Sequence, residues 1–264
     1  MYPVINIFGR DIGTYSLLFI VGLAVSVIGA IFVTKKKNIM YEDIILAFVS
    51  VGVGILVGGH LLYGITQMAN AVKFISVIDK LSIKTIGYLL VLTFGGSVFY
   101  GGFIGAVAAL FIHTKFSKDL KRSDIFDIFA IFIPLFHAFG RVGCFFGGCC
   151  YGIESRFGFT VMGNSLVPEL NGVSRFPVQL FEAALNLCIF AILLYLFLKT
   201  SVNGNLIFVY MFLYPIVRFC MEFLRGDAIR GRVLWLSTSQ WISLGLFTIS
   251  VVYFVQKFRK KKSV

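Results

Sequence analysis

Residues 125–146 read IFDIFAIFIPLFHAFGRVGCFF, an apolar run with an arginine, Arg141, near its end. A helix of about 20 residues crosses a hydrocarbon core of about 30 Å, so the length of this run predicts a transmembrane span. An ionised side chain inside the membrane costs roughly 2.5 to 3.5 kcal/mol on insertion scales, so a helix keeps one where it is paired or used. The same stretch therefore predicts a membrane helix and a candidate site.

The whole chain has this membrane character, because 58% of its 264 residues are hydrophobic and 14% are charged. Its apolar residues form seven blocks, near Tyr15–Thr34, Asp43–Ile65, Ile86–His113, Ile125–Phe146, Val178–Leu198, Leu206–Leu224 and Trp235–Val255. The blocks are continuous and do not alternate, which favours helices over a β-barrel. We expect an all-α polytopic membrane protein with seven transmembrane helices, built as a single integral membrane domain over residues 1–264.

The net charge of +12 arises from short basic clusters between the apolar blocks and from the tail Lys257–Lys262. Such clusters are typical of membrane topology, so we expect no nucleic-acid partner. Loops on one side of the predicted membrane carry thirteen lysines and arginines, against nine on the other side. Because cytoplasmic loops are richer in these residues, we expect the N-terminus outside and the C-terminus in the cytoplasm.

A second arginine, Arg218, lies inside a span, near the outward end of the sixth apolar block. With Glu222 and Arg225 it follows the spacing i, i+4, i+7, which predicts one polar stripe on a helix. His137 and Arg141 have the same i, i+4 relation. A salt bridge that holds the helices together accounts for such a stripe as well as a site does, so the spacing alone leaves both interpretations open.

Glycines are concentrated around Arg141, at Gly140, Gly143, Gly147, Gly148 and Gly152, and again along Gly95–Gly105. Glycine permits close contact between helices or close approach by a ligand. An arginine in a glycine-lined cleft of low dielectric suits a phosphate group. In an outer leaflet the abundant phosphate is a lipid headgroup, so the pattern favours a phospholipid site.

Over its whole length the chain resembles the prolipoprotein diacylglyceryl transferase family. The residues that carry the resemblance are Pro3–Val4, Phe8–Gly9, Tyr15, Gly58–Tyr63, Tyr100–Gly102, Asp127–Leu135, Gly140–Gly143, Gly152, Phe157–Val161, Arg175–Glu182, Arg218–Arg225 and Leu236–Gln240. The resemblance implies seven spans with an outside N-terminus in a bacterial inner membrane, and an active site toward the outer leaflet. It implies transfer of diacylglyceryl from phosphatidylglycerol to the cysteine thiol of a prolipoprotein signal peptide, with release of glycerol phosphate and without a cofactor.

The resemblance also implies roles for individual residues. Arg141 and Arg218 match the family's arginines and would clamp the departing phosphate, and Glu222 would orient Arg218. His137 and Tyr100 are further catalytic candidates. The candidates for substrate binding are Tyr15, His60, Gly101, Gly102, Gly140, Gly143, Gly152, Gln179, Glu182, Glu222 and Arg225.

The chain departs from the family at several of its polar positions. Tyr100 stands where the family has a histidine, and His60 where it has an arginine. Cys144 and Gly147 replace two asparagines, and Cys149 replaces a glutamate. Tyrosine, with an ordinary pKa near 10, is a poorer base at neutral pH than histidine near 6.5. The phosphate clamp is thus retained, while much of the apparatus for the acceptor is changed.

Three functions are compatible with these departures. The first is a lipoprotein transferase in which His137 or His60 supplies the missing imidazole. The second is a sister transferase that uses a glycerophospholipid donor and another acceptor, such as a glycan or a small molecule. The third is a lipid-binding or transport protein without covalent chemistry, which the arginines argue against because an unused buried charge is costly.

Three cysteines, Cys144, Cys149 and Cys150, follow Arg141 closely. With His137 they offer four ligands of the types that zinc prefers, and a thiol beside an arginine can also act as a nucleophile. Their spacing matches no standard zinc motif, and small thiols pack well among glycines. We therefore expect no metal and assign the cysteines to packing, with a redox role and a metal as the alternatives.

Overall fold

The computed structural model of the chain describes residues 2–35, 39–76, 82–117, 121–164, 168–199, 204–227 and 231–262. Within these ranges it has eight α-helices: α1 (Thr14–Thr34), α2 (Tyr41–Ile75), α3 (Ile83–Phe94), α4 (Phe99–Phe116), α5 (Arg122–Gly147), α6 (Val178–Lys199), α7 (Leu206–Glu222) and α8 (Thr238–Lys262). Six of these helices, α1, α2, α4, α5, α6 and α8, are long and apolar enough to cross a membrane. The chain is therefore a mostly helical polytopic membrane protein.

The third apolar block is not one helix, and this part of the prediction is wrong. It forms α3 and α4, which are separated by residues 95–98. The amide of Val98 donates a hydrogen bond to the carbonyl of Gly59 in α2, at 3.1 Å. A Cβ atom at Gly96 would lie 2.5 Å from the ring of Tyr63, also in α2. The break therefore lets this segment approach α2 closely, which is a tertiary contact that apolar periodicity does not report.

Two more corrections concern lengths and strands. α2 continues to Ile75, well past its predicted end at Ile65, whereas α7 has 17 residues and is shorter than the six long helices. The all-α prediction also missed the three two-stranded antiparallel sheets found among the described residues. They pair β1 (Val4–Ile7) with β2 (Arg10–Gly13), β3 (Glu154–Thr160) with β4 (Ser174–Arg175), and β5 (Arg232–Val233) with β6 (Leu236–Ser237).

The chain forms two compact units, one of residues 1–33 and 123–264 and the other of residues 34–122. The second unit contains α2, α3 and α4, and glycines hold it together. Cβ atoms at Gly54 and Gly58 would overlap carbonyl oxygens of α4, those of Gly105 and Gly101. Backbone atoms cannot swing aside as a flexible side chain can, so these glycines are what allows α2 and α4 to pack by direct backbone contact.

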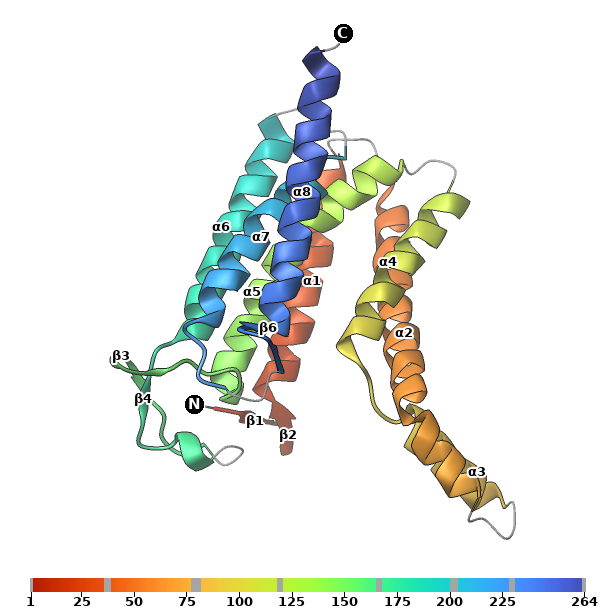
Figure 1. The fold of residues 1–264 in the computed structure, drawn as a ribbon, viewed down its shortest axis with the longest axis vertical. Helices are drawn as coiled ribbons and strands as arrows, with labels where there is room; N and C mark the ends of the chain where they lie inside the picture. Colours follow the sequence, from red (N-terminus) through yellow and green to blue (C-terminus); the bar gives the residue numbers. More distant parts are fainter. Residues whose placement is uncertain are drawn as a thin grey trace. The chain divides into compact units, whose positions relative to one another are not determined.

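In the first unit, α1, α5, α6, α7 and α8 run side by side (Figure 1). A Cβ at Gly22 of α1 would lie 2.6 Å from Phe139 of α5, and one at Gly29 equally close to Phe132. The ring of Phe132 also contacts Phe190 of α6, with centroids 5.9 Å apart. The N-terminal hairpin and the strands β3, β4 and β6 lie at one end of this bundle, and the C-terminus lies at the other end (Figure 1).

Asp127, the acid inside the stretch 125–146, is fully buried and fixes the start of α7. Its carboxylate accepts hydrogen bonds from the backbone amides of Gly204 (2.8 Å) and Leu206 (2.9 Å). The amides at a helix N-terminus have no partner within the helix and carry partial positive charge, so a carboxylate is stabilised there. α5 thereby holds the beginning of α7, whose far end carries Arg218.

The glycine contact between α2 and α4 predicts a sharp contrast between two neighbouring substitutions. Gly54→Ala forces a methyl group into the backbone of α4 and should cost about 1–3 kcal/mol, as overpacking does. Gly52→Ala is the matched control on the same helix, because a Cβ there meets no atom within 4 Å. We expect thermal unfolding of the purified protein in detergent to show a lower midpoint for Gly54→Ala and an unchanged one for Gly52→Ala. Equal midpoints for both variants would contradict the backbone contact.

Candidate functional site

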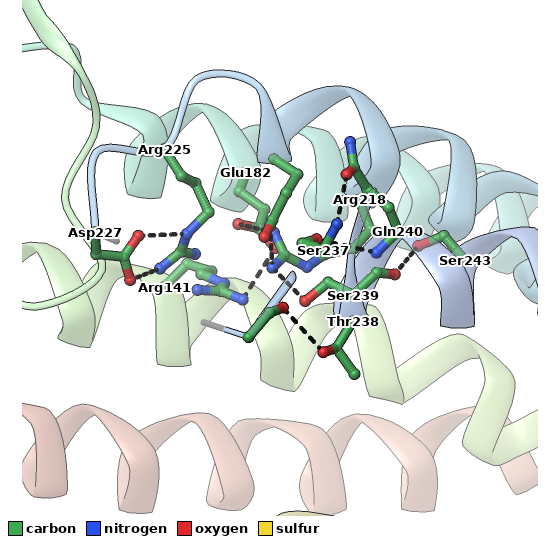
Figure 2. A network of polar contacts seen from close by, with 12 residues as sticks. Arg141, Glu182, Arg218, Arg225, Asp227, Ser237, Thr238, Ser239, Gln240 and Ser243 are labelled. Atoms are coloured by element: carbon green, nitrogen blue, oxygen red, sulfur yellow. Dashed lines mark hydrogen bonds and ion pairs between the residues drawn. The ribbon is translucent and has the colours of Figure 1, made fainter. Parts of the chain in front are cut away.

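Three helices of the first unit bring charged side chains to the same end of the bundle. His137 and Arg141 lie in the last turns of α5, Glu182 lies near the start of α6, and Arg218 and Glu222 lie in the last turns of α7. Because α6 runs antiparallel to its two neighbours, the end of α5, the start of α6 and the end of α7 meet. Figure 2 shows the resulting network of polar contacts.

Glu182 is the centre of this network. Its carboxylate is fully buried, and Arg141 Nη2 lies 3.1 Å from Oε1 while Arg218 Nη1 lies 4.0 Å from Oε2. Two guanidiniums this close would repel each other strongly in a medium of low dielectric, and a buried carboxylate without partners would be equally unfavourable. One carboxylate between two arginines removes both penalties. The family resemblance made Glu182 a candidate for substrate binding, and the structure places it between the two arginines.

Arg218 is held from two further sides. Its Nη2 lies 2.5 Å from Glu222 Oε2, and it donates a hydrogen bond to Ser239 Oγ at 3.0 Å. The structure thus brings Arg218 and Glu222 together as their i, i+4 spacing predicts. Ser239 belongs to the first turn of α8, so the arginine ties α7 to both α6 and α8.

A capping box fixes the start of α8 and with it the position of Ser239. The amide of Gln240 donates to Ser237 Oγ at 3.2 Å, and the amide of Ser237 donates to Gln240 Oε1 at 3.0 Å. This reciprocal pair satisfies two backbone amides that a helix start leaves without partners. The sequence Ser-Thr-Ser-Gln before an apolar run is the known signature of such a start, so the beginning of α8 was detectable, whereas the contact of Ser239 with Arg218 was not.

Arg225 does not continue the stripe of Arg218 and Glu222, so the i+7 part of that prediction is wrong. α7 ends at Glu222, and Arg225 lies in the following loop, where it pairs with Gly152 as an isolated β-bridge. Its guanidinium forms a bidentate ion pair with Asp227, with Nε–Oδ1 at 2.8 Å and Nη2–Oδ2 at 2.6 Å. Asp227 was not predicted, and its spacing of two residues from Arg225 is a loop geometry that helical periodicity cannot signal.

His137 touches both members of the central ion pair. Its Nε2 accepts a hydrogen bond from Arg141 Nε at 3.2 Å and lies 3.9 Å from Glu182 Oε1. The ring also lies beside Tyr214, with centroids 5.3 Å apart. An acceptor nitrogen carries no proton, so the bond from Arg141 holds the imidazole neutral and occupies its Nε2 lone pair. His137 is therefore positioned to support Arg141.

The glycines near Arg141 have different surroundings. A Cβ at Gly140 would meet no atom within 4 Å, so packing does not require a glycine at this position. Gly143 instead faces the Tyr15 ring, at 3.1 Å from a Cβ placed there. A Cβ at Gly152 would overlap the carbonyl oxygen of Phe176, which explains why glycine is needed in this loop.

Gln179, another predicted binding residue, links the first turn of α6 to the loop after α5. Its Nε2 donates to the carbonyl of Cys149 at 2.9 Å, and the side chain is buried. Its contact thus fixes loop backbone close to the arginines.

The remaining predicted site residues belong to the second unit. The Nδ1 of His60 lies 2.7 Å from the carbonyl oxygen of Phe94, so Nδ1 carries the proton and donates it, which leaves Nε2 as the basic nitrogen. Tyr100 is the second residue of α4 and is 45% exposed. Gly101 and Gly102 face α2, where a Cβ at Gly101 would overlap the carbonyl oxygen of Gly58, so their visible role is helix packing.

Comparison with known proteins identifies the family to which this arrangement belongs. The family model described as prolipoprotein diacylglyceryl transferase matches residues 3–256. The chain belongs to the prolipoprotein diacylglyceryl transferase family. The match spans both compact units and includes every residue of the charged network.

Several curated members of the family are similar to the chain over nearly its full length. The phosphatidylglycerol–prolipoprotein diacylglyceryl transferase of Clostridium tetani is 32% identical over 99% of this chain and 100% of its own length. Transferase 2 of Clostridium perfringens is 32% identical over 97% of this chain and 96% of its own length. The enzyme of Campylobacter jejuni strain 81-176 is 30% identical over 97% and 93%. The resemblance inferred from the motifs is therefore confirmed.

The position of Glu182 in this family member predicts a large effect of removing its charge. Glu182→Gln leaves two buried guanidiniums without their shared counter-charge, which should cost about 3–5 kcal/mol, as breaking a buried ion pair does. Glu154→Gln is the matched control, because Glu154 pairs with Arg175 at 3.5 Å but is 72% exposed. We expect a much lower unfolding midpoint in detergent for Glu182→Gln and almost none of that shift for Glu154→Gln, since surface pairs contribute about 0–1 kcal/mol. A Glu182→Gln protein as stable as the parent would show that the arginines do not depend on this carboxylate.

Proposed function

We propose that this chain transfers diacylglyceryl from phosphatidylglycerol to the thiol of the lipobox cysteine in prolipoproteins. The observation that carries the proposal is the placement of Arg141 and Arg218, from two different helices, around one buried carboxylate. In the reaction, a thiolate sulfur attacks the carbon of the diacylglyceryl group that bears the phosphate. The bond between this carbon and the phosphate oxygen breaks, and glycerol phosphate departs with the electron pair. The thiol's proton goes to a base.

We propose seven transmembrane helices for this enzyme, which are the six long helices and α7, acting as one integral membrane domain over residues 1–264. An odd number of spans puts the termini on opposite sides, and the termini lie at opposite ends of the first unit (Figure 1). With the C-terminus in the cytoplasm of a bacterial inner membrane, the charged network faces the outer leaflet. Of the loop cations behind this orientation, Lys36, Lys37, Lys80, Lys118 and Arg230 lie outside the described residues.

The arginines suit the phosphate for a reason beyond their charge. The network pairs its three arginines with three carboxylates, so it has no large excess of positive charge to attract an anion. However, Nη1 of Arg218 is buried and has no hydrogen-bond partner among the residues that the structure describes. A buried donor without a partner is costly, and a phosphate oxygen would satisfy it. As the phosphodiester becomes a monoester it gains a second negative charge, which the arginines would stabilise in the transition state.

The two histidines differ in their ability to accept the proton of the thiol. His137 Nε2 is already occupied by the hydrogen bond from Arg141. His60 donates its Nδ1 proton to the Phe94 carbonyl and so keeps Nε2 basic. These hydrogen bonds support a positioning role for His137 beside Arg141, and they support His60, with Nε2 able to accept a proton, as the candidate base.

The clamp predicts that Arg141→Ala and Arg218→Ala each reduce transfer by at least about 100-fold, the usual effect of losing an anion-stabilising donor. Arg141→Lys should also fail if the contact is bidentate, because lysine cannot form two parallel hydrogen bonds. Arg10→Ala, at an exposed position in β2, is the control and should retain activity. The measurement is rescue of a strain depleted of its lipoprotein transferase, with mass spectrometry of a reporter lipoprotein.

Two outcomes of this experiment would contradict the proposal in different ways. Rescue by a membrane-inserted Arg141→Ala protein would show that Arg141 is not needed to bind the phosphate. Failure of the unaltered chain to place diacylglyceryl on the reporter cysteine, with the protein inserted, would instead favour a transferase with another acceptor.

The hydrogen bonds of the histidines predict a second contrast. His60→Gln should lower kcat/KM for a lipobox peptide by about 100-fold or more, since general bases contribute about 10²–10⁴-fold. His137→Gln should have a smaller effect, because a glutamine carbonyl can still accept from Arg141. Both rates should be measured in detergent with phosphatidylglycerol as the donor. A larger loss in His137→Gln would reverse the assignment.

A further inference from the structure

Three thiols at the end of α5 converge on one point. The sulfur atoms of Cys144, Cys149 and Cys150 all lie within 4.8 Å of one another. None of the three is disulfide-bonded, and Cys144 is buried. The remaining cysteines, Cys188 in α6 and Cys220 in α7, lie in separate helices and are exposed.

The backbone after α5 folds back to bring these thiols together. The amide of Cys149 donates to the carbonyl of Cys144 at 3.1 Å and closes the end of the helix. Gly148 and Cys150 both have left-handed backbone conformations, with φ of 72° and 58°. Left-handed conformations are uncommon for residues other than glycine and cost free energy, so Cys150 is held there by its surroundings.

A buried arginine adjoins the cluster. The side chain of Arg225 is 3% exposed. Its guanidinium forms an ion pair with Asp227 and also contacts the thiol of Cys150. A thiolate is the form of cysteine that binds metal, and the fixed positive charge of Arg225 would stabilise thiolates held beside it.

We propose that Cys144, Cys149 and Cys150 form a zinc site at the outward end of α5. Zinc–sulfur bonds of about 2.3 Å put two sulfurs of a tetrahedral site about 3.8 Å apart, so the observed triangle must contract by no more than about 1 Å. Three thiolates and one zinc ion carry a net charge of −1, which faces Arg225. Three protein ligands leave the fourth position of the ion open to a further ligand.

The zinc site explains the fold of the loop better than packing does. Thiols that merely fill space need no common point, and apolar packing gives no reason for a buried arginine to contact one of them. A disulfide uses two sulfurs and leaves the convergence of the third unexplained. This inference does not depend on the proposed transferase activity, and it is tested by metal binding.

The test uses the full chain purified in detergent, with zinc measured by elemental mass spectrometry. The parent protein should hold about one equivalent of zinc, and cobalt should replace it with a sulfur-to-metal charge-transfer band. Cys149→Ser and Cys150→Ser should each lose the band and most of the zinc. Cys188→Ser and Cys220→Ser, which alter thiols outside the cluster, should behave as the parent does.

A second measurement needs no substitution and so avoids variants that fail to fold. Zinc added to the metal-free parent protein should protect the three clustered cysteines from alkylation, as read by peptide mass spectrometry, and leave the labelling of Cys188 and Cys220 unchanged. A parent protein that binds no zinc, equal zinc in Cys149→Ser, uniform alkylation, or a disulfide within the cluster would each overturn the proposal.

Discussion

The buried carboxylate of Glu182 is the interaction on which the architecture of the site depends. Arg141 and Arg218 come from helices far apart in the sequence, and without an anion between them their charges would drive α5 and α7 apart. The cost of burying three ionised groups is offset because each has an opposite charge within reach. The same contact that makes the bundle stable also sets the two guanidiniums beside each other.

Other contacts in the first unit fix the positions of the helices that carry these charged side chains. Asp127 of α5 caps α7, and the capping box of Ser237 and Gln240 starts α8 so that Ser239 reaches Arg218. The contacts of Asp127 and of the capping box satisfy backbone amides that a helix end would leave unpaired in a membrane, where water cannot replace them. Helix ends are therefore both the weak points of the bundle and the places where its polar groups collect.

Much of this could be predicted from the sequence, and the failures have physical causes. Continuous apolar runs gave the long helices, and the spacing of Arg218 and Glu222 gave their ion pair, because both follow from helical geometry alone. The break before α4 could not be predicted, since it depends on the approach of Gly96 to Tyr63 in another helix. The prediction for Arg225 was wrong for a related reason. α7 ends at Glu222, and outside a helix a spacing of seven residues does not put two side chains on the same face. The partnership of Glu182 with two arginines likewise depends on three helices meeting, which no local pattern encodes.

The balance of charge in the network bears on how the site can discriminate its ligand. A cluster of uncompensated arginines would bind any anion, including free phosphate, and would hold the product as tightly as the donor. In the proposed reaction, Glu182 and Glu222 would neutralise the arginines before the donor binds, so an incoming phosphodiester would gain little from long-range attraction and would have to fit a buried donor such as Nη1 of Arg218. The arginines would then act most strongly when the second phosphate charge appears, which is where stabilisation accelerates a reaction. The same carboxylates would oppose retention of the doubly charged product, so a neutral network would favour turnover over tight binding.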